Sequence, residues 1–438
     1  MYMRRNVSKY LERWKADKYR KPLVVQGARQ VGKTYAILEF GKTNYDSVAY
    51  FNFETDKKLA TTFEENISPS YLLPILSHIS GQKISKESTL VVFDEIQLCE
   101  RALTSLKYFC EQAPEYHVVA AGSLLGVAVN RKKNAFPVGK IDRYTMFSMD
   151  MEEFLRACGE DDLVERIRAC YGSDEPMPAA LHDATLNRYR QYLAVGGLPE
   201  VVARFVDTND YTQVRHVQET IQADYLDDMS KYQESANEIK KTRLTYDTIA
   251  VQLSKKNARF QYKIVKTGAR AAEYENAIEW LASANLISQV YRVGQIAKPL
   301  ENYKDIDDFK VYLSDMGLLC AQKGVRAEDV FFMEDELTDF KGGMTENYVD
   351  AQLIRSGLKP YFWRNAKGTS EVDFVVNLGG KLVPIEVKSG GRTRSTSLNE
   401  YVKLFNPAWS IRVSEKNFGF DANIKSVPLY AVFCIRDS

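Results

Sequence analysis

The sequence has 438 residues, which is longer than one typical hydrophobic core requires and predicts roughly two to four domains. Its 59 Lys and Arg residues against 58 Asp and Glu residues exclude a histone-like polycation and an acidic tail, and its 12% aromatic content excludes a mainly disordered chain. The six cysteines form no C-x-x-C pair, which disfavours zinc, and no run approaches the roughly 18 apolar residues of a membrane span, so we expect a cytoplasmic protein that does not enter a membrane.

The first third of the chain predicts an α/β domain. Apolar runs at 22–27, 48–53, 90–93 and 117–121 alternate with polar stretches of helical pattern. Such alternation is typical of a parallel sheet with helices on both faces. After Phe147 the pattern changes to amphipathic helices, which we expect at 151–157, 181–195 and 211–229.

The second half begins with a basic stretch. Residues 240–270 contain nine Lys or Arg residues and one acid, Asp247, and a helix at 273–285 and a strand at 286–293 follow. From 309 onward the pattern is mixed, with a helix at 345–356, strands at 371–378 and 381–387 joined by Gly379-Gly380, and a last strand near 430–435.

A phosphate-binding loop lies between the first predicted strand and the first helix after it. Its sequence matches G-x-x-x-x-G-K-[ST], in which glycines turn backbone N–H groups inward and one lysine supplies positive charge. We expect ATP to bind there, with Lys33 on the phosphates and the Thr34 hydroxyl on Mg²⁺. The loop consists of Gly27, Ala28, Arg29, Gln30, Val31, Gly32, Lys33 and Thr34.

A second motif supplies the acids that such a site needs. The apolar strand at 89–93 is followed by Asp94 and Glu95. We expect Asp94 to hold the Mg²⁺ shell and Glu95 to orient or polarise the water that attacks the γ-phosphate. Two exposed acids at a strand end are the simpler alternative, which the neighbouring loop disfavours.

Together, the stretches 25–34, 93–97 and 121–124 resemble a large prokaryotic group of AAA-type ATPases. The resemblance implies that Ser123, after the fourth strand, senses the γ-phosphate, although Ser123 is about equally well explained as a helix cap. It also implies an arginine finger from a neighbouring subunit, and hence a homo-oligomer. Lys140 stands where that arginine is usual, and Lys cannot reproduce a bidentate guanidinium. Arg143 or Arg131 would then substitute, or activation by a neighbouring subunit would be weak. The alternative is that each of the two arginines is a solvated surface charge.

Later stretches at 192–200, 225–228 and 310–319 resemble the helical lid and C-terminal region of such ATPases. Between them, the three-helix stretch that contains the basic residues and ends in the strand at 286–293 is similar to a winged helix, which implies DNA as a partner. Its cations would bind phosphates without reading bases, unless they form a solvated face or an internal docking surface. They are Lys255, Lys256, Arg259, Lys263, Lys266 and Arg270.

The last part of the chain carries Glu346 in 345–349, Asp373 in 371–376, and Glu386 and Lys388 in 385–388. In this order the four residues resemble the PD-(D/E)xK nuclease core. That resemblance implies that Glu346, Asp373 and Glu386 bind Mg²⁺ or Mn²⁺ and that Lys388 positions water or stabilises the transition state. A hairpin would bring the acids and the lysine to one face of a sheet. A surface Glu-x-Lys ion pair, or a core that keeps its acids for other reasons, is the alternative.

These motifs predict an α/β P-loop ATPase domain at 1–155, a helical lid at 156–235, a winged-helix-like segment at 236–308 and an α/β nuclease-like domain at 309–438. The predicted function is ATP hydrolysis coupled to DNA binding, with metal-dependent DNA cleavage as a further activity. The alternative is an ATP-dependent switch or regulator that binds DNA or protein and cuts nothing. A nucleotide kinase is disfavoured by the long remainder of the chain.

Overall fold

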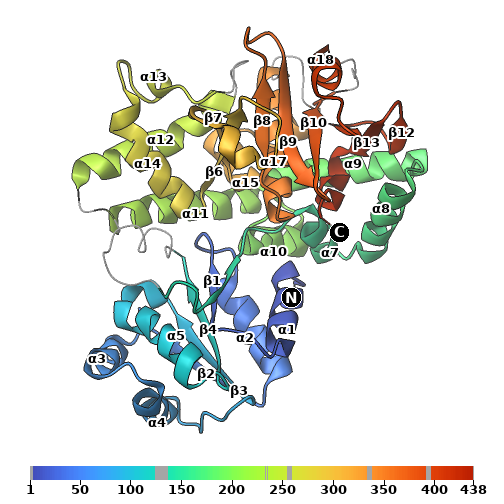
Figure 1. The fold of residues 1–438 in the computed structure, drawn as a ribbon. Coiled ribbons are helices and arrows are strands. Elements are labelled where there is room, and N and C mark those ends of the chain that lie inside the picture. Colours follow the sequence, from blue (N-terminus) through green and yellow to red (C-terminus); the bar gives the residue numbers. More distant parts are fainter. Residues whose placement is uncertain are drawn as a thin grey trace. The chain divides into compact units, whose positions relative to one another are not determined.

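The computed structural model describes residues 3–123, 137–231, 233, 235–253, 259–332, 338–390 and 396–437 (Figure 1). Three predicted cations, Arg131, Lys255 and Lys256, lie outside these residues. The chain forms two compact units: an N-terminal unit of Arg4–Phe147 with Ser283–Asn285, and a C-terminal unit of Met1–Met3, Ser148–Ala282 and Leu286–Ser438. No helix in the described ranges is long and apolar enough to cross a membrane.

The N-terminal unit is built on a five-stranded parallel sheet with the order β2-β3-β4-β1-β5. The four strands predicted in this unit are confirmed. The fifth strand, β5, was not predicted, because it is short and polar and contains no apolar run. The strands are β1 (Leu23–Gln26), β2 (Ser47–Asn52), β3 (Thr89–Asp94), β4 (His117–Gly122) and β5 (Asp142–Thr145).

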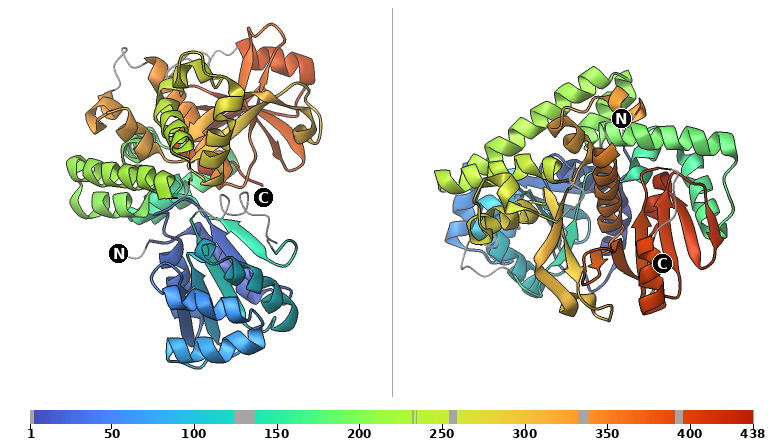
Figure 2. Two further views of the ribbon diagram at one scale, coloured as in Figure 1. Left: turned by 90° about the vertical axis from the view of Figure 1, so that its left-hand side faces the viewer. Right: turned by 90° about the horizontal axis from the view of Figure 1, so that it is seen from above.

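Helices cover both faces of this sheet, as the sequence predicts (Figures 1 and 2). Ala49 and Val91 belong to the apolar cluster shared with α3, α4 and α5, whereas the preceding residues, Val48 and Leu90, pack against Gly41 of α2. Successive strand residues point to opposite faces, so α2 lies on the face opposite α3–α5. The helices are α1 (Asn6–Ala16), α2 (Lys33–Asn44), α3 (Lys57–Glu65), α4 (Pro69–Ser80), the 3₁₀ turn η1 (Ile96–Leu98) and α5 (Glu100–Gln112).

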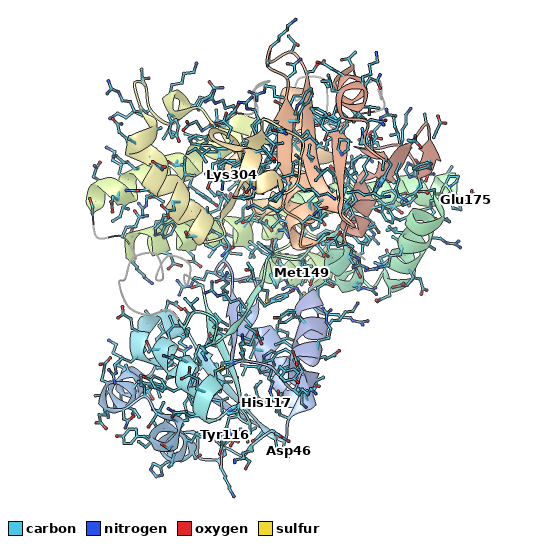
Figure 3. The ribbon with its side chains drawn as sticks, in the orientation of Figure 1. Asp46, Tyr116, His117, Met149, Glu175 and Lys304 are labelled. Carbon is cyan, nitrogen blue, oxygen red and sulfur yellow. The ribbon has the colours of Figure 1, made fainter. Side chains whose placement is uncertain are left out.

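His117, labelled in Figure 3, begins β4 and is a packing residue. Its Nδ1 atom is hydrogen-bonded to the Tyr45 hydroxyl at 2.6 Å, and its ring packs edge-on against Trp14. Burial lowers the pKa of His117 to about 4, so the imidazole is neutral in the folded protein at pH 7.

The C-terminal unit begins with helices, and those predicted at 151–157, 181–195 and 211–229 are confirmed. Asp150 starts the first of them, because its carboxylate accepts from the Glu153 N–H while the Glu153 carboxylate accepts from the Asp150 N–H. The helices are α7 (Met151–Ala157), α8 (Asp161–Ser173), α9 (Ala179–Val195), α10 (Pro199–Thr208), α11 (Tyr211–Lys231), α12 (Ala236–Leu253), α13 (Tyr262–Val265) and α14 (Ala271–Ser283).

An eight-stranded mixed sheet with the order β12-β13-β11-β10-β9-β8-β6-β7 follows. β9 and β10 form the predicted hairpin, in which Gly379 and Gly380 have positive φ angles of 53° and 73°. The strands are β6 (Ile287–Val293), β7 (Lys304–Leu313), β8 (Tyr361–Arg364), β9 (Glu371–Leu378), β10 (Lys381–Val387), β11 (Ser410–Ser414), β12 (Gly419–Asp421) and β13 (Ile424–Pro428).

Several of the remaining helices of this unit contact the sheet. α17 contacts β7 and β10, whereas α18 contributes Tyr401 to an apolar cluster with residues of β6, β8 and β9. The predicted helix at 345–356 is the second half of α17, which begins earlier. These elements are the 3₁₀ turn η2 (Leu300–Tyr303), α15 (Met316–Gln322), α16 (Ala327–Phe332), α17 (Thr338–Arg355), α18 (Thr396–Phe405) and the 3₁₀ helix η4 (Leu429–Cys434).

The structure differs from the sequence-based expectation in two places. The strand predicted near 430–435 is wrong, because residues 429–434 form η4 and all of them are buried. A short run in which every residue is apolar and buried shows no alternation of apolar and polar residues, so its sequence pattern does not distinguish a strand from a helix. The boundary expected between 308 and 309 falls inside β7, and β6 pairs with both β7 and β8. The winged-helix-like and nuclease-like segments therefore share one sheet.

Candidate functional site

The phosphate-binding loop connects β1 to α2, and its glycines are structurally required. Gly27 and Gly32 have φ angles of 151° and 90°, and Gln30 has a φ of 63°. A Cβ atom on Gly27 would lie 2.0 Å from the Met146 carbonyl oxygen. No L side chain fits in this position, so the loop conformation depends on glycine.

Lys33 is the first residue of α2 and is only 7% exposed. Its ammonium donates to the carbonyl oxygens of Gly27 at 2.9 Å and Ala28 at 2.8 Å. Burial lowers the pKa of Lys33 to about 8, although Glu95 and Asp94 act in the opposite direction. The cation therefore lies within the loop, where the phosphates are expected.

Thr34 and Asp94 form the oxygen-rich part of the site. The Thr34 hydroxyl donates to Asp94 Oδ2 at 2.9 Å, and the Tyr50 hydroxyl donates to the same oxygen at 2.7 Å. Hydroxyl and carboxylate oxygens are the hard ligands that Mg²⁺ prefers, so the residues fit this cofactor. Tyr50 lies on β2, the strand next to β3, and its role was not predicted from the sequence.

Glu95 follows β3 in a strained backbone conformation, with a φ of 51°. Gln97 Nε2 donates to its Oε2 atom at 2.5 Å, and the Ser123 hydroxyl lies 3.5 Å from the same oxygen. Burial raises the pKa of Glu95 above its ordinary value, which makes the carboxylate a stronger base. Ser123 reaches this site because β4 lies between β1 and β3 in the sheet.

Arg5 supports the loop from outside the motif. Its guanidinium is buried and donates to the carbonyl oxygens of Val31 at 2.8 Å and Phe147 at 2.7 Å. Arg29, in the loop itself, pairs with Glu54 at 3.7 Å. The sequence did not predict this role of Arg5, which is one of several basic residues near the N-terminus. Its hydrogen bonds join it to Val31 and Phe147, which are distant in sequence.

No arginine finger can be assigned from the described residues. Lys140, at the position expected for the finger, pairs with Glu111 of the same unit at 3.0 Å. Arg143 lies on β5 and is exposed, and Arg131 is outside the described residues. A finger supplied by a neighbouring subunit therefore stays a prediction.

The acids predicted for the nuclease-like site do lie close together. Lys388 pairs with Glu386 Oε1 at 2.6 Å, and Asp373 Oδ2 accepts from the Val387 N–H at 2.7 Å. Burial, and then the carboxylates of Glu386 and Glu346, raise the pKa of Asp373 well above its ordinary value. The hairpin and α17 thus bring together the four residues that the sequence singled out.

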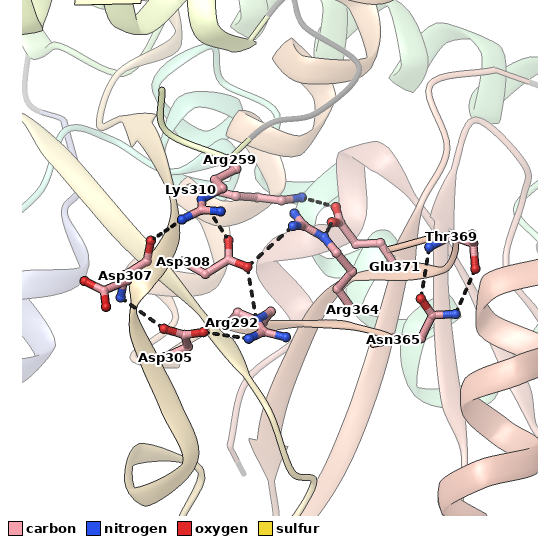
Figure 4. Close-up of polar contacts among 10 residues, drawn as sticks. All are labelled: Arg259, Arg292, Asp305, Asp307, Asp308, Lys310, Arg364, Asn365, Thr369 and Glu371. Atoms are coloured by element: carbon pink, nitrogen blue, oxygen red, sulfur yellow. Dashed lines mark hydrogen bonds and ion pairs between the residues drawn. The ribbon is translucent and has the colours of Figure 1, made fainter. Parts of the chain in front are cut away.

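An unpredicted lysine lies beside these acids, and Figure 4 shows its ion pair with a further carboxylate, that of Glu371. Lys310 on β7 is fully buried, and its ammonium is 2.7 Å from Glu371 Oε1 and 3.1 Å from Glu346 Oε2. Burial lowers the pKa of Lys310, but the carboxylates of Glu346, Glu371 and Asp373 raise it by more. Among the residues that the structure describes, no group of three or more His, Cys, Asp or Glu side chains is arranged to hold a metal ion.

The basic stretch of the C-terminal unit is only partly available to a ligand. Arg259 donates to the Asp307 carbonyl oxygen at 2.9 Å and lies 3.6 Å from the Asp308 carboxylate. Lys263, Lys266 and Arg270, on and after α13, are exposed. The helix that follows, α14, carries three glutamates and no Lys or Arg, so it is poorly suited to approach DNA phosphates.

Comparisons with known proteins support the assignment of the N-terminal unit. Residues 19–155 match the model of an AAA domain, and residues 186–329 and 341–432 match two domains of unknown function. The search of curated proteins found no match.

Two solved structures have low similarity to this chain. A Walker-type ATPase of Pyrococcus abyssi is 13% identical over 74% of this chain and 96% of that chain, with a TM-score of 0.45. The ORC2 protein of Aeropyrum pernix is 13% identical over 76% of this chain and 95% of that chain, with a TM-score of 0.36.

The AAA match coincides with the loop, the sheet order and the converging acids described above. The N-terminal unit is a P-loop ATPase domain of the AAA type.

Proposed function

We propose that the protein binds and hydrolyses ATP and that its nucleotide state governs DNA binding by the C-terminal unit. The observation that carries the ATPase proposal is the convergence of Lys33, Thr34, Asp94 and Glu95 on one edge of the sheet. Carboxyl ends of adjacent parallel strands meet at this edge, where α/β proteins bind their ligands.

Each side chain has a separate role in this proposal. The Lys33 ammonium binds the phosphates, and Glu95 accepts a proton from, or polarises, the attacking water. The Ser123 hydroxyl, near Glu95, senses the γ-phosphate. Thr34 and Asp94 would hold Mg²⁺, which neutralises charge on the phosphates when bound.

Two substitutions test the division of roles. Lys33→Ala should weaken ATP binding, because it removes a ground-state contact, whereas Glu95→Gln should keep binding and lose turnover. Titration with ATP and measurement of phosphate release distinguish the two variants. Glu64→Gln, the same change at an exposed position of α3, is the matched control and should change neither quantity. Equal loss of ATP affinity in the Lys33 and Glu95 variants would contradict the assigned roles.

The DNA part of the proposal rests on the exposed cations Lys263, Lys266 and Arg270. Clustered exposed Lys and Arg side chains bind phosphates largely without regard to sequence. Metal-dependent DNA cleavage is a second candidate function of the C-terminal unit, supported by the order of Glu346, Asp373, Glu386 and Lys388. The ion pairs of Lys310 favour the non-cleaving alternative, in which this region only binds.

A further inference from the structure

The acidic cluster of the C-terminal unit contains its own positive charges. We define this cluster by its four acids, Glu346, Glu371, Asp373 and Glu386. Lys310 pairs with Glu346 and Glu371, and Lys388 pairs with Glu386. Arg364 donates to Glu371 at 2.8 Å. Three of the four acids are thus already matched by protein cations.

We propose that Lys310 takes the place of a divalent cation in this cluster, so that the nuclease-like fold is closed to metal and serves as a non-cleaving module. This proposal rests on the proposed function and specifies the role of the C-terminal unit, which binds DNA without cleaving it. The ATPase part of the proposal does not depend on it.

The hydrogen bonds at the oxygens explain why a metal does not fit. Glu346 Oε2 accepts from both Lys310 and the Tyr312 hydroxyl, at 3.1 and 3.0 Å. Asp373 Oδ2 accepts from a backbone N–H, and Glu386 Oε1 from Lys388. A divalent ion would need these same oxygens, because Mg²⁺ and Mn²⁺ prefer oxygen-rich coordination.

Displacing Lys310 would leave a charge without compensation. The Lys310 side chain has no exposed surface, and its ammonium lies over the Phe362 ring, 5.1 Å from the ring centre. A buried ammonium that loses its carboxylates has no water to replace them. Metal entry would therefore leave a buried ammonium without its carboxylate partners, which is strongly unfavourable, so the site favours the lysine over a metal ion.

Side chains of β6, β8 and β9 hold Lys310 in position on the edge strand β7. Asp308, Lys310 and Tyr312 alternate along β7 and so lie on one face of the sheet. Arg364 links Glu371 to Asp308, and Arg292 links Asp308 to Asp305, at N–O distances of 2.6–3.4 Å. Figure 4 shows this series of ion pairs across the strands, with Lys310 at one end.

Mn²⁺ binding to the nucleotide-free full chain tests the proposal directly. Electron paramagnetic resonance counts bound Mn²⁺ in the unmodified protein and in two variants, Asp94→Asn and Glu346→Gln. We expect that any Mn²⁺ bound by the unmodified protein is lost in Asp94→Asn and unchanged in Glu346→Gln. A Mn²⁺ site that disappears in Glu346→Gln would overturn the proposal.

Lys310→Met, which keeps the length of the side chain but removes its charge, tests the exchange of lysine for metal. We expect its melting temperature to fall and Mn²⁺ to restore part of the loss, with no restoration once Asp373→Asn is added. A folded Lys310→Met variant that Mn²⁺ does not stabilise would contradict the proposal. If this variant does not fold, the Mn²⁺ count on the unmodified protein and on Glu346→Gln still tests whether the acidic cluster binds a metal ion.

The cleavage assay completes the test. We expect no cleavage of plasmid DNA by the unmodified protein with Mn²⁺, and cleavage that Asp373→Asn abolishes would refute the inference. ATP turnover, which depends on Glu95, is measured in the same preparation. A failure of the inference is therefore distinguishable from a failure of the ATPase proposal.

Discussion

Burial shifts the pKa values of two side chains at the nucleotide site. It lowers the pKa of Lys33 to about 8 and raises the pKa of Glu95, so the free nucleotide site holds a cation that titrates near physiological pH and a carboxylate with increased basicity. Phosphate binding would raise the pKa of Lys33, because the ligand brings negative charge to the ammonium. The affinity for ATP must then depend on pH.

We predict that ATP affinity falls as the pH rises above about 8. Below this pH, Lys33 is charged in both the free and the bound protein, so its contribution is constant. Above it, the free protein must take up a proton on binding, and Kd rises by up to tenfold per pH unit until the pKa of the bound state is reached. ATP titrations at pH values from about 7 to about 10 would show this rise in Kd.

Lys33→Arg is the control for this pH dependence. Arginine stays protonated over the whole range, so the variant should show a flat profile even if its affinity is lower. A profile in Lys33→Arg that rises with that of the unmodified protein would assign the titration to another group.

At the scale of elements, α17 packs unusually close to α12. A Cβ atom on Gly343 would lie 2.0 Å from the Leu253 carbonyl oxygen, at the end of α12. The neighbouring Gly342 has no atom within 4 Å of its Cβ position. One glycine is therefore required by the packing, and the other only weakens the helix.

We predict opposite effects of the same substitution at these two glycines. Gly343→Ala should lower the free energy of unfolding by about 1–3 kcal/mol, because the helices must separate. Gly342→Ala should raise it by about 0.5–1 kcal/mol, because alanine is the better helix former. Urea unfolding of the full chain measures both. Equal stabilisation by the two variants would show that helix propensity, and not contact with Leu253, controls this segment.

The features that depend only on residues close together in the sequence were the most predictable. The phosphate-binding loop and the β9–β10 hairpin need only local residue types, and both are confirmed. Lys310 gave no such signal, because its partners are Glu346 and Glu371, which are distant in sequence and come from α17 and β9. Tyr50 and Arg5 were missed for the same reason, since tertiary contacts alone connect them to the nucleotide site.

For the whole molecule, the net charge of +1 means that attraction to DNA must come from a local surface. The exposed cations Lys263, Lys266 and Arg270 lie in the C-terminal unit, whereas the nucleotide site lies in the N-terminal unit. If nucleotide state governs DNA affinity, linkage requires that DNA change nucleotide affinity by the same factor. A regulator without such coupling would show two independent binding reactions.

We predict that DNA binding is salt-sensitive and weakly dependent on sequence, and that Lys263→Glu combined with Lys266→Glu weakens it. Each lost phosphate contact removes about 0.9 from the slope of log K against log salt on duplex DNA, so the double variant should lose about 2 in slope. Fluorescence anisotropy at several salt concentrations measures the affinity and the slope. Lys57→Glu with Lys58→Glu, the same charge change at exposed positions of α3 in the N-terminal unit, is the matched control and should leave the slope unchanged. If both double variants reduce the slope equally, the effect comes from overall charge, and the exposed cations near α13 are not the DNA site.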